Sequence, residues 1–434
     1  MKIVGGKWSN WSGSVRFRAR AVDVPQDEVD LAVAVRKAEG RVRFPGDGYS
    51  FSPLNQTDGT LIDLAAFVGL KGFDPEREVA TIAAATPMWG LGSLLHPLGY
   101  ALKNMADIDR QTLGGAVATG THGTGLKFGS LSADVASFRL LLTTGQVLHC
   151  APDENPDIFA AGRVALGLFG VMTEIDMAVR PIYKLQRRHF VRPVKELFRQ
   201  LDGMVGANRN FEFFWFPMSD VAVCKSLNET EANAPTRHSA RTLFARGEIR
   251  RPREYLFAGG CEILRTMPGL TRPMHKFFTA VMVPKQKVRW SHEVYPTVRT
   301  VKFNEIEYAV PYEKGAEAVQ EVVELIRKKK LSTCFPIEFR TVAADDIWLS
   351  PFYGRDSAVI SIQQYAKMDS RPLFSACEAI LKSYGGRPHW GKMHTLTRDE
   401  ALALYPKFEE FCALRRKLDP KNKFLNEHLA AYFA

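Results

Sequence analysis

The sequence lacks the features of several common protein classes. Its six cysteines show no C-x-x-C spacing, so we expect neither a disulfide framework nor a cysteine-based zinc site. No run of about 18 apolar residues occurs, and we expect no membrane span. The apolar run that follows Met1 is too short for a signal peptide. These absences predict a cytoplasmic protein whose thiols are buried and reduced.

Recognised nucleotide and nucleic-acid motifs are also missing. The G-x-G-x-x-G and G-K-S/T patterns of the common nucleotide-binding folds do not occur, nor does a DNA- or RNA-binding motif. The net charge of +11 is densest between Arg237 and Arg253, where we expect a solvated surface or an anion-binding role. His389 and His394 are five residues apart without a carboxylate partner, so no metal site is expected.

The composition that is present predicts a folded α+β protein. With 434 residues, 46% of them hydrophobic, the chain can bury a full core and is expected to form two domains. We place the boundaries at 1–181, 182–384 and a tail of 385–434. Apolar spacing predicts helices within 24–39, 88–98, 315–328, 371–384 and 397–417, and strands at 79–83, 171–179, 211–216, 303–310, 336–342 and 358–364. A hairpin is expected over 138–149.

Two glycine-rich loops are the most informative features that the chain does contain. One spans Gly114 to Gly125 and is rich in threonine, and the other spans Pro45 to Pro53. Glycine lets a ligand approach the backbone closely, and turns of this kind expose N–H donors that bind phosphate groups. Each loop alone is also typical of an ordinary surface turn. Together they predict a site for a phosphate-bearing cofactor.

Six segments in order carry a resemblance to one family. They are 43–52 (RFPGDGYSFS), 119–125 (TGTHGTG), 166–174 (LGLFGVMTE), 211–217 (FEFFWFP), 338–340 (EFR) and 387–392 (RPHWGK). With them the chain resembles the sugar-1,4-lactone and alditol oxidases, including D-arabinono-1,4-lactone oxidase. The resemblance implies a two-domain vanillyl-alcohol-oxidase-type (PCMH-type) FAD-binding fold. In it, 1–181 and the tail 385–434 bind FAD and 182–384 forms an α+β cap over the isoalloxazine ring.

The resemblance also implies which residues hold FAD. They are Pro45, Gly46, Asp47, Gly48, Tyr49, Ser50, Ala106, Asp107, Gln111, Gly114, Gly115, Thr119, Gly120, His122, Gly123, Thr124, Gly125, Gly170 and Val171. Family members often carry, at the position of Tyr49, a histidine that bonds covalently to the flavin. A phenol is not expected to make that bond, so we expect dissociable FAD. A link through His122 is the alternative.

The catalytic candidates are Glu338, Arg340, Lys392 and His389. Glu338 and Arg340 are two apart on an expected strand and should share one face. By themselves they are more typical of a surface ion pair, and Lys392 is more typical of a solvated turn. The resemblance implies that Glu338 and Arg340 position substrate hydroxyls and that Lys392 reaches the reacting one. A lysine desolvated beside an arginine can have a lowered pKa and act as the base, with His389 as its helper.

Three departures from the family leave the substrate open. Asp107 stands where alditol oxidases show serine, and it could pair with Arg340 or with a substrate group. Gln363-Gln364-Tyr365 and Met218 stand where relatives often carry histidine. We expect an FAD-dependent oxidoreductase acting on a CH–OH group of a sugar, polyol or aldono-1,4-lactone, with oxygen or another acceptor reoxidising the flavin. The alternatives are oxidation of a non-sugar natural-product alcohol and an inactive FAD-fold binding protein.

Overall fold

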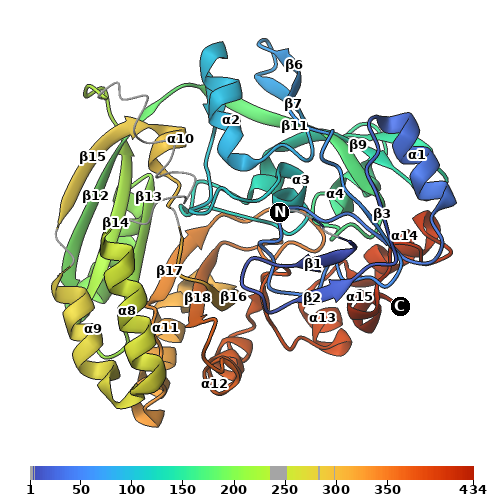
Figure 1. Ribbon diagram of the computed structural model, residues 1–434. Coiled ribbons are helices and arrows are strands. Elements are labelled where there is room, and N and C mark those ends of the chain that lie inside the picture. The colour runs from blue at the N-terminus through green and yellow to red at the C-terminus, as the bar shows by residue number, and fades with distance from the viewer. Residues whose placement is uncertain (1–2, 4, 235–251, 282–283, 298) are drawn as a thin grey trace.

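The structure is a computed structural model that describes residues 3, 5–234, 252–281, 284–297 and 299–434. Two large sheets organise it, one on each side of the molecule (Figure 1). Most of the arginine-rich segment 237–253 lies outside the described residues, so its expected role stays a prediction.

The first sheet builds the N-terminal part. Its strand order is β10-β9-β11-β7-β6, with β8 paired to β11. The strands are β6 (Leu70–Asp74), β7 (Val79–Ala83), β8 (Tyr100–Leu102), β9 (Val135–Leu141), β10 (Val147–Cys150) and β11 (Val171–Pro181). Smaller sheets flank it, formed by β1 (Lys7–Ser9) with β2 (Arg16–Arg18), and by β3 (Ala21–Asp23), β4 (Val42–Arg43) and β5 (Thr60–Ile62). β11 alternates buried and half-buried residues along most of its length, as expected for a strand with one face in the core.

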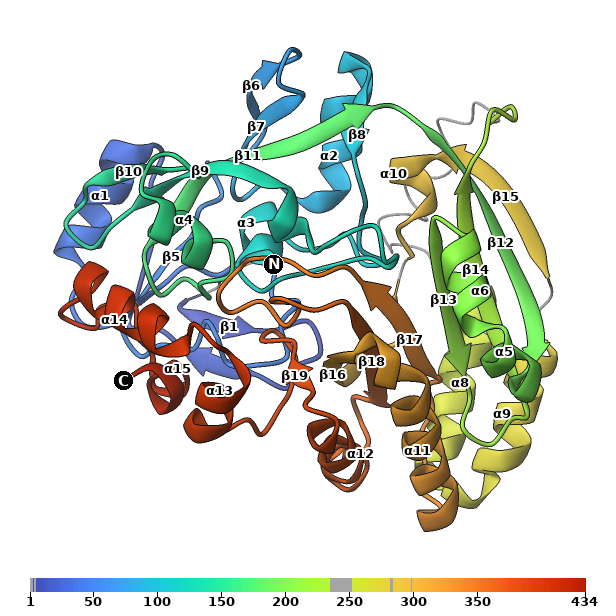
Figure 2. The same ribbon diagram turned by 180° about the vertical axis from the view of Figure 1, so that it is seen from behind.

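The second sheet has eight strands in the order β15-β12-β14-β13-β17-β18-β16-β19. They are β12 (Lys184–Pro193), β13 (Asn210–Trp215), β14 (Val221–Glu229), β15 (Lys285–Trp290), β16 (Phe303–Pro311), β17 (Ile337–Val342), β18 (Ser357–Tyr365) and β19 (Arg387–Pro388). All of its pairings are antiparallel. One face packs apolar side chains against α11 (Tyr312–Lys329), which covers the outer side of β17 and β18 (Figure 2). The opposite face turns toward the first part of the chain.

The remaining helices cover the two sheets. They are α1 (Glu28–Lys37), α2 (Met88–Leu95), α3 (Leu113–Val117), α4 (Pro156–Gly162), α5 (Val194–Arg199), α6 (Leu201–Ala207), α8 (Pro252–Thr266), α9 (Thr271–Ala280), α10 (Ser291–Val294), α12 (Arg371–Ser383), α13 (Arg398–Leu404), α14 (Phe408–Leu418) and α15 (Glu427–Phe433). Short 3-10 turns occur at η1 (His96–Leu98), η2 (Leu131–Asp134) and η3 (Pro268–Leu270).

One expected helix proves to be two. The segment 397–417 was expected to be continuous, but α13 ends at Leu404 and α14 begins at Phe408. Pro406 explains the break, because the residue before a proline is pushed out of the helical region. Tyr405 accordingly has φ −112° and ψ 104°.

The C-terminal helices pack into the first part of the chain and not into the second sheet. Phe411 stacks on Phe169 with ring centroids 4.6 Å apart, and Phe408, Phe411 and Phe433 belong to the same buried cluster as Phe169. The division of the chain into domains after residues 181 and 384 remains our proposal. All six cysteines are free and buried. Within the described residues, no helix combines the length and the apolar character needed to cross a bilayer.

Candidate active site

A cavity of about 410 Å³ lies between the glycine-rich loops and the inner face of the eight-stranded sheet. Its volume falls in the range of small-molecule and cofactor sites. One end is formed by the first part of the chain and the other end by charged residues of the sheet and by His389 and Lys392. The two glycine loops and the catalytic candidates therefore meet at one site.

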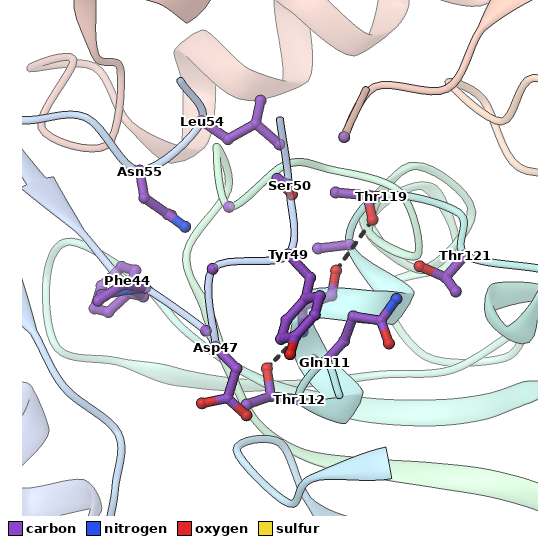
Figure 3. Close-up of a pocket in the computed structure, with 18 of the residues that line it drawn as sticks. Phe44, Asp47, Tyr49, Ser50, Leu54, Asn55, Gln111, Thr112, Thr119 and Thr121 are labelled. Atoms are coloured by element: carbon purple, nitrogen blue, oxygen red, sulfur yellow. Dashed lines mark hydrogen bonds between the residues drawn. The ribbon is translucent and has the colours of Figure 1, made fainter. Parts of the chain in front are cut away.

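The loop 46–50 is built to bind an anion. Within the described residues, the backbone N–H groups of Gly46, Gly48, Tyr49 and Ser50 donate to no protein acceptor. The side-chain oxygen of Gln111 is buried there without a partner. Figure 3 shows Tyr49 projecting from this loop toward Gln111 and Thr112. Unpaired donors at a glycine loop suit a diphosphate, and an unpaired buried acceptor suits a ligand N–H. The residues present therefore fit FAD.

Most of the expected cofactor residues line this cavity. They are Pro45, Gly46, Asp47, Gly48, Tyr49, Ser50, Ala106, Asp107, Gln111, Gly114, Gly115, Thr119, His122, Gly170 and Val171. Gly120, Gly123, Thr124 and Gly125 are not among its lining residues in the described chain, and their contact with the cofactor stays a prediction. Their part of the loop instead joins the two halves of the molecule. Thr124 Oγ1 donates to Phe211 O at 2.7 Å, and Gly125 N donates to Thr341 O at 2.7 Å.

Replacing Gly125 with alanine is expected to destabilise this junction. Gly125 has φ +124°, and a Cβ there would lie 2.6 Å from the backbone oxygen of Arg209. Strain and overlap together predict a loss of about 2–4 kcal/mol in the free energy of unfolding. Urea unfolding measures it, with Gly99→Ala as the control. Gly99 also has positive φ (+82°) but has open space around it. Equal losses in both variants would contradict the role of the close approach.

Strand register gathers the charges of the site on one face of the sheet. Lys225 on β14 lies opposite Glu212 on β13, and Glu212 Oε2 in turn accepts from Arg340 Nε on β17 at 3.2 Å. In the neighbouring row, Glu338 lies opposite Ser361, which lies opposite Glu307. Because side chains alternate along a strand, these rows point to the same side of the sheet. The prediction that Glu338 and Arg340 share a face is confirmed.

Glu338 and Arg340 form a buried pair at the cavity wall. Arg340 donates through Nη2 to Glu338 Oε1 and through Nε to Glu212 Oε2 at 3.2 Å. Burial raises the pKa of Glu338 to about 7, since the nearby charges of Glu212 and Asp107 add to it and Arg340 offsets it in part. Glu338 can therefore gain or lose a proton near neutral pH. The surface ion pair considered from the sequence is excluded, because the Glu338 side chain is only 3% exposed.

Lys392 differs from the sequence expectation in its pKa. Its Nζ lies 2.5 Å from Glu305 Oε2 and 5.2 Å from the ring centre of Phe51. Burial by itself would lower the pKa of Lys392, but Glu305 and Glu307 outweigh it and raise the pKa. The expected lysine with a lowered pKa is therefore wrong: carboxylates on β16 hold it as an ammonium ion. A charged Lys392 can donate a hydrogen bond to a substrate oxygen.

Two histidines complete the floor of the cavity. His122 contacts Gly123 O through Nδ1 at 2.8 Å and Glu307 Oε1 through Nε2 at 3.1 Å. His389 Nδ1 accepts from Gly391 N at 2.9 Å. Burial lowers the pKa of His389 to about 3, so its ring is neutral at ordinary pH. His389 is thus a weak base that can still donate through its other nitrogen.

Asp107 pairs with partners that the sequence did not suggest. Its Oδ1 accepts from Lys225 Nζ at 3.1 Å and its Oδ2 accepts from Arg299 Nη2 at 2.6 Å. Burial would raise the pKa of Asp107, but Lys225 and Arg299 hold it well below its usual range. The expected pair with Arg340 does not form among the described residues, since Glu212 and Glu338 occupy that guanidinium.

The sequence missed Arg299, Glu305 and Glu307 as lining residues. Glu305 and Glu307 did leave a signal, because they alternate within the apolar strand β16. Arg299 lies between β15 and β16 outside any helix or strand, so no periodicity marks it. Among the positions where relatives often carry histidine, Gln363 lines the cavity, whereas Gln364, Tyr365 and Met218 do not.

Comparison with known proteins agrees with this site. The family model of D-arabinono-1,4-lactone oxidase matches residues 175–432, and the model of an FAD binding domain matches residues 19–151. L-gulono-1,4-lactone dehydrogenase of Mycobacterium tuberculosis is 35% identical over 429 residues, covering 97% of each chain. L-gulonolactone oxidase of Bos taurus is 32% identical, covering 99% of this chain and 98% of its own.

More distant relatives share the architecture. Alditol oxidase of a Streptomyces species is 26% identical, with 97% of each chain covered. Among solved structures, cholesterol oxidase of Brevibacterium sterolicum superposes with a TM-score of 0.81 at 16% identity, covering 99% of this chain and 97% of that one. At that identity the likeness establishes the fold alone. The expected vanillyl-alcohol-oxidase-type FAD-binding fold is confirmed.

Proposed function

The chain belongs to the D-arabinono-1,4-lactone oxidase family of FAD-dependent oxidoreductases, and from that premise we propose that it oxidises a CH–OH group of an aldonolactone or alditol. The observation that carries the proposal is the cavity itself. Its glycine end offers unpaired backbone donors, and its other end brings Glu338, Arg340 and Lys392 together. Oxygen or another electron acceptor then reoxidises the flavin.

The chain's own residues supply the proton chemistry. When bound, FAD supplies the hydride acceptor at N5. Glu338, with a pKa of about 7, takes the hydroxyl proton on a carboxylate oxygen, because a base works best when its pKa is near the working pH. The ammonium of Lys392 donates to the same substrate oxygen and stabilises its developing negative charge. The O–H and C–H bonds break and a C=O bond forms.

Arg340 has a positioning part in this scheme. Its guanidinium donates one hydrogen bond to Glu212 and one to Glu338. These two bonds fix the direction of its remaining N–H donors at the wall of the cavity. Fixed donors cost no reorganisation when substrate hydroxyls arrive. His389, neutral and buried, acts as a donor beside Lys392 and takes no proton.

We propose further that FAD is held without a covalent bond. The ring of Tyr49 stacks on Trp11 with centroids 5.8 Å apart, and burial raises the pKa of its hydroxyl, so it is a neutral phenol. Both ring nitrogens of His122 are engaged, by Gly123 and Glu307, which leaves neither for a bond to flavin.

Acid precipitation tests the attachment. We expect the yellow colour to appear entirely in the supernatant, as free FAD, because neither Tyr49 nor His122 supplies a bonding atom. Tyr49→Phe serves as the matched variant and is expected to release FAD in the same way, since it keeps the ring that stacks on Trp11. Flavin that stays with the precipitated wild-type protein and is lost from the precipitate in Tyr49→Phe would contradict the proposal.

The function is tested by anaerobic flavin reduction. FAD-loaded protein is mixed with aldonolactones, alditols and sugars while the visible flavin band is followed. Bleaching by lactones or alditols supports the proposal, and admission of air then shows whether oxygen restores the colour. A panel that bleaches the flavin with none of these compounds would contradict it and favour a non-sugar alcohol.

A further inference from the structure

We propose that Arg299 is a specificity-determining residue, held in place by Asp107, which selects substrates that carry an acyl oxygen, that is, aldonolactones over alditols. The inference rests on the proposed function and narrows its substrate class. It rests on the part of the cavity wall formed by Arg299, a residue that lies outside every motif found in the sequence.

Arg299 is placed to contact a substrate. Its side chain is 27% exposed and lines the cavity that also contains Glu338, Arg340 and Lys392. Of its nitrogens, Nη2 donates to Asp107 Oδ2 at 2.6 Å. Within the described residues, its other N–H groups have no hydrogen-bond partner. Arg299 therefore keeps free donors at the cavity wall.

Asp107 fixes that arginine and has most of its acceptor capacity in use. Besides Arg299, it accepts from Lys225 Nζ at 3.1 Å and from Thr297 Oγ1 at 2.9 Å. Its side chain is 6% exposed. Lys225 also forms an ion pair with Glu212, with Nζ 2.6 Å from Oε1. Three donors, two of them cationic, thus fill most of the acceptor capacity of this buried carboxylate, which holds Arg299 in place.

The wall formed by Arg299 and Asp107 consequently presents mainly hydrogen-bond donors. A hydroxyl group placed against it could accept a hydrogen bond from Arg299, but its own hydrogen would meet only a carboxylate that already accepts three hydrogen bonds. A carbonyl or ring oxygen has no hydrogen to satisfy and accepts fully. Because leaving a buried donor unpaired is costly, the wall favours an oxygen that only accepts.

Other lining residues of the cavity have the reverse character. Glu338, Glu305 and Gln363 provide oxygens that can accept from hydroxyl groups. A substrate with an acyl group at one end and hydroxyl groups along the rest matches both the donors of Arg299 and these acceptor oxygens. An aldonolactone has this pattern, whereas an alditol has hydroxyl groups only.

The test compares matched substrates in matched variants. Wild type, Arg299→Met and Arg299→Lys are loaded with FAD and mixed anaerobically with L-gulono-1,4-lactone, the alditol of the same configuration and the open-chain aldonate. Arg272→Met, an exposed arginine on α9 outside the cavity, is the control. We expect the ratio of kcat/KM for lactone to kcat/KM for alditol to fall about 10- to 100-fold in Arg299→Met. Arg299→Lys should restore the ratio in part.

Three results would overturn the inference. Lactone and alditol rates that fall by the same factor would show a general structural role, and two rates that both stay at the wild-type value would show no role. A wild-type preference for the aldonate over the lactone would assign the wall to a carboxylate.

A binding measurement separates this inference from the proposed function. γ-Butyrolactone carries the acyl group but no hydroxyl to oxidise, so it can perturb the flavin absorption band without turnover. We expect its Kd to rise at least tenfold in Arg299→Met, consistent with the loss of a charge-assisted hydrogen bond. An unchanged Kd would overturn the role of Arg299 even if substrates reduce the flavin. If no lactone or alditol reduces the wild-type flavin, the proposed function fails instead.

Discussion

Lys392→Met is expected to slow anaerobic flavin reduction about 10²- to 10⁴-fold while FAD stays bound. Lys392 forms an ion pair with Glu305 in the cavity, with Nζ 2.5 Å from Oε2. Its raised pKa keeps it charged, so its loss removes a preorganised donor from the reacting oxygen. Methionine keeps an unbranched side chain but removes the ammonium group that lies over the Phe51 ring. Stopped-flow absorbance of the flavin band measures the effect.

Controls separate chemistry from folding in this variant. Removing one partner of a buried ion pair leaves Glu305 uncompensated, so stability and FAD content must be recorded as well. Lys382→Met is the matched control, because Lys382 is also ion-paired, to Glu400 at 2.9 Å, but lies outside the cavity. Lys392→Arg keeps the charge and is expected to retain more activity than Lys392→Met. Full turnover by FAD-loaded Lys392→Met would remove Lys392 from the mechanism.

Glu338→Gln is expected to reduce the rate of flavin reduction about 10²- to 10⁴-fold at pH 8 and to abolish its pH dependence near 7. The pKa of Glu338 is raised by burial to about 7, so half of the carboxyl groups are ionised at that pH. The ionised form accepts the proton. The wild-type rate should therefore fall about tenfold per pH unit below 7 and level off above it.

Pre-steady-state rates at several pH values test the assignment. Glu410→Gln, at an exposed glutamate paired with Lys407, is the control and should keep the wild-type profile. A Glu338→Gln variant that keeps both the rate and the inflection near pH 7 would show that another group takes the proton. A variant that loses the rate but keeps the inflection would leave Glu338 as a hydrogen-bonding residue only.

Local features explain why much of the fold was predictable. β7 was expected at 79–83 and was found there, and the helices near 315–328 and 371–384 were found within three residues of their expected ends. Apolar periodicity reports the buried face of an element directly. The break at Pro406 was missed although its signal was present, because long apolar spacing on both sides suggested a single helix.

The candidate site was predictable where a residue's role follows from its neighbours in sequence. The loop 45–50 exposes backbone donors because of its own glycines. Glu338 and Arg340 share a face because they are two apart on one strand. The resemblance to the family added Lys392 and His389, and all four candidates line the cavity.

The sequence by itself determined the family, the FAD-binding fold and the two glycine-rich loops, because these depend on short motifs and on local backbone preference. Tertiary structure alone decided the rest of the site. Strand register placed Lys225 opposite Glu212, which also accepts from Arg340, and β16 brought the carboxylates that keep Lys392 charged. Packing also turned Gly123 to Gly125 into a junction and aimed Arg299 into the cavity. Register and electrostatic environment are set by residues far apart in the chain, so no local pattern contains them.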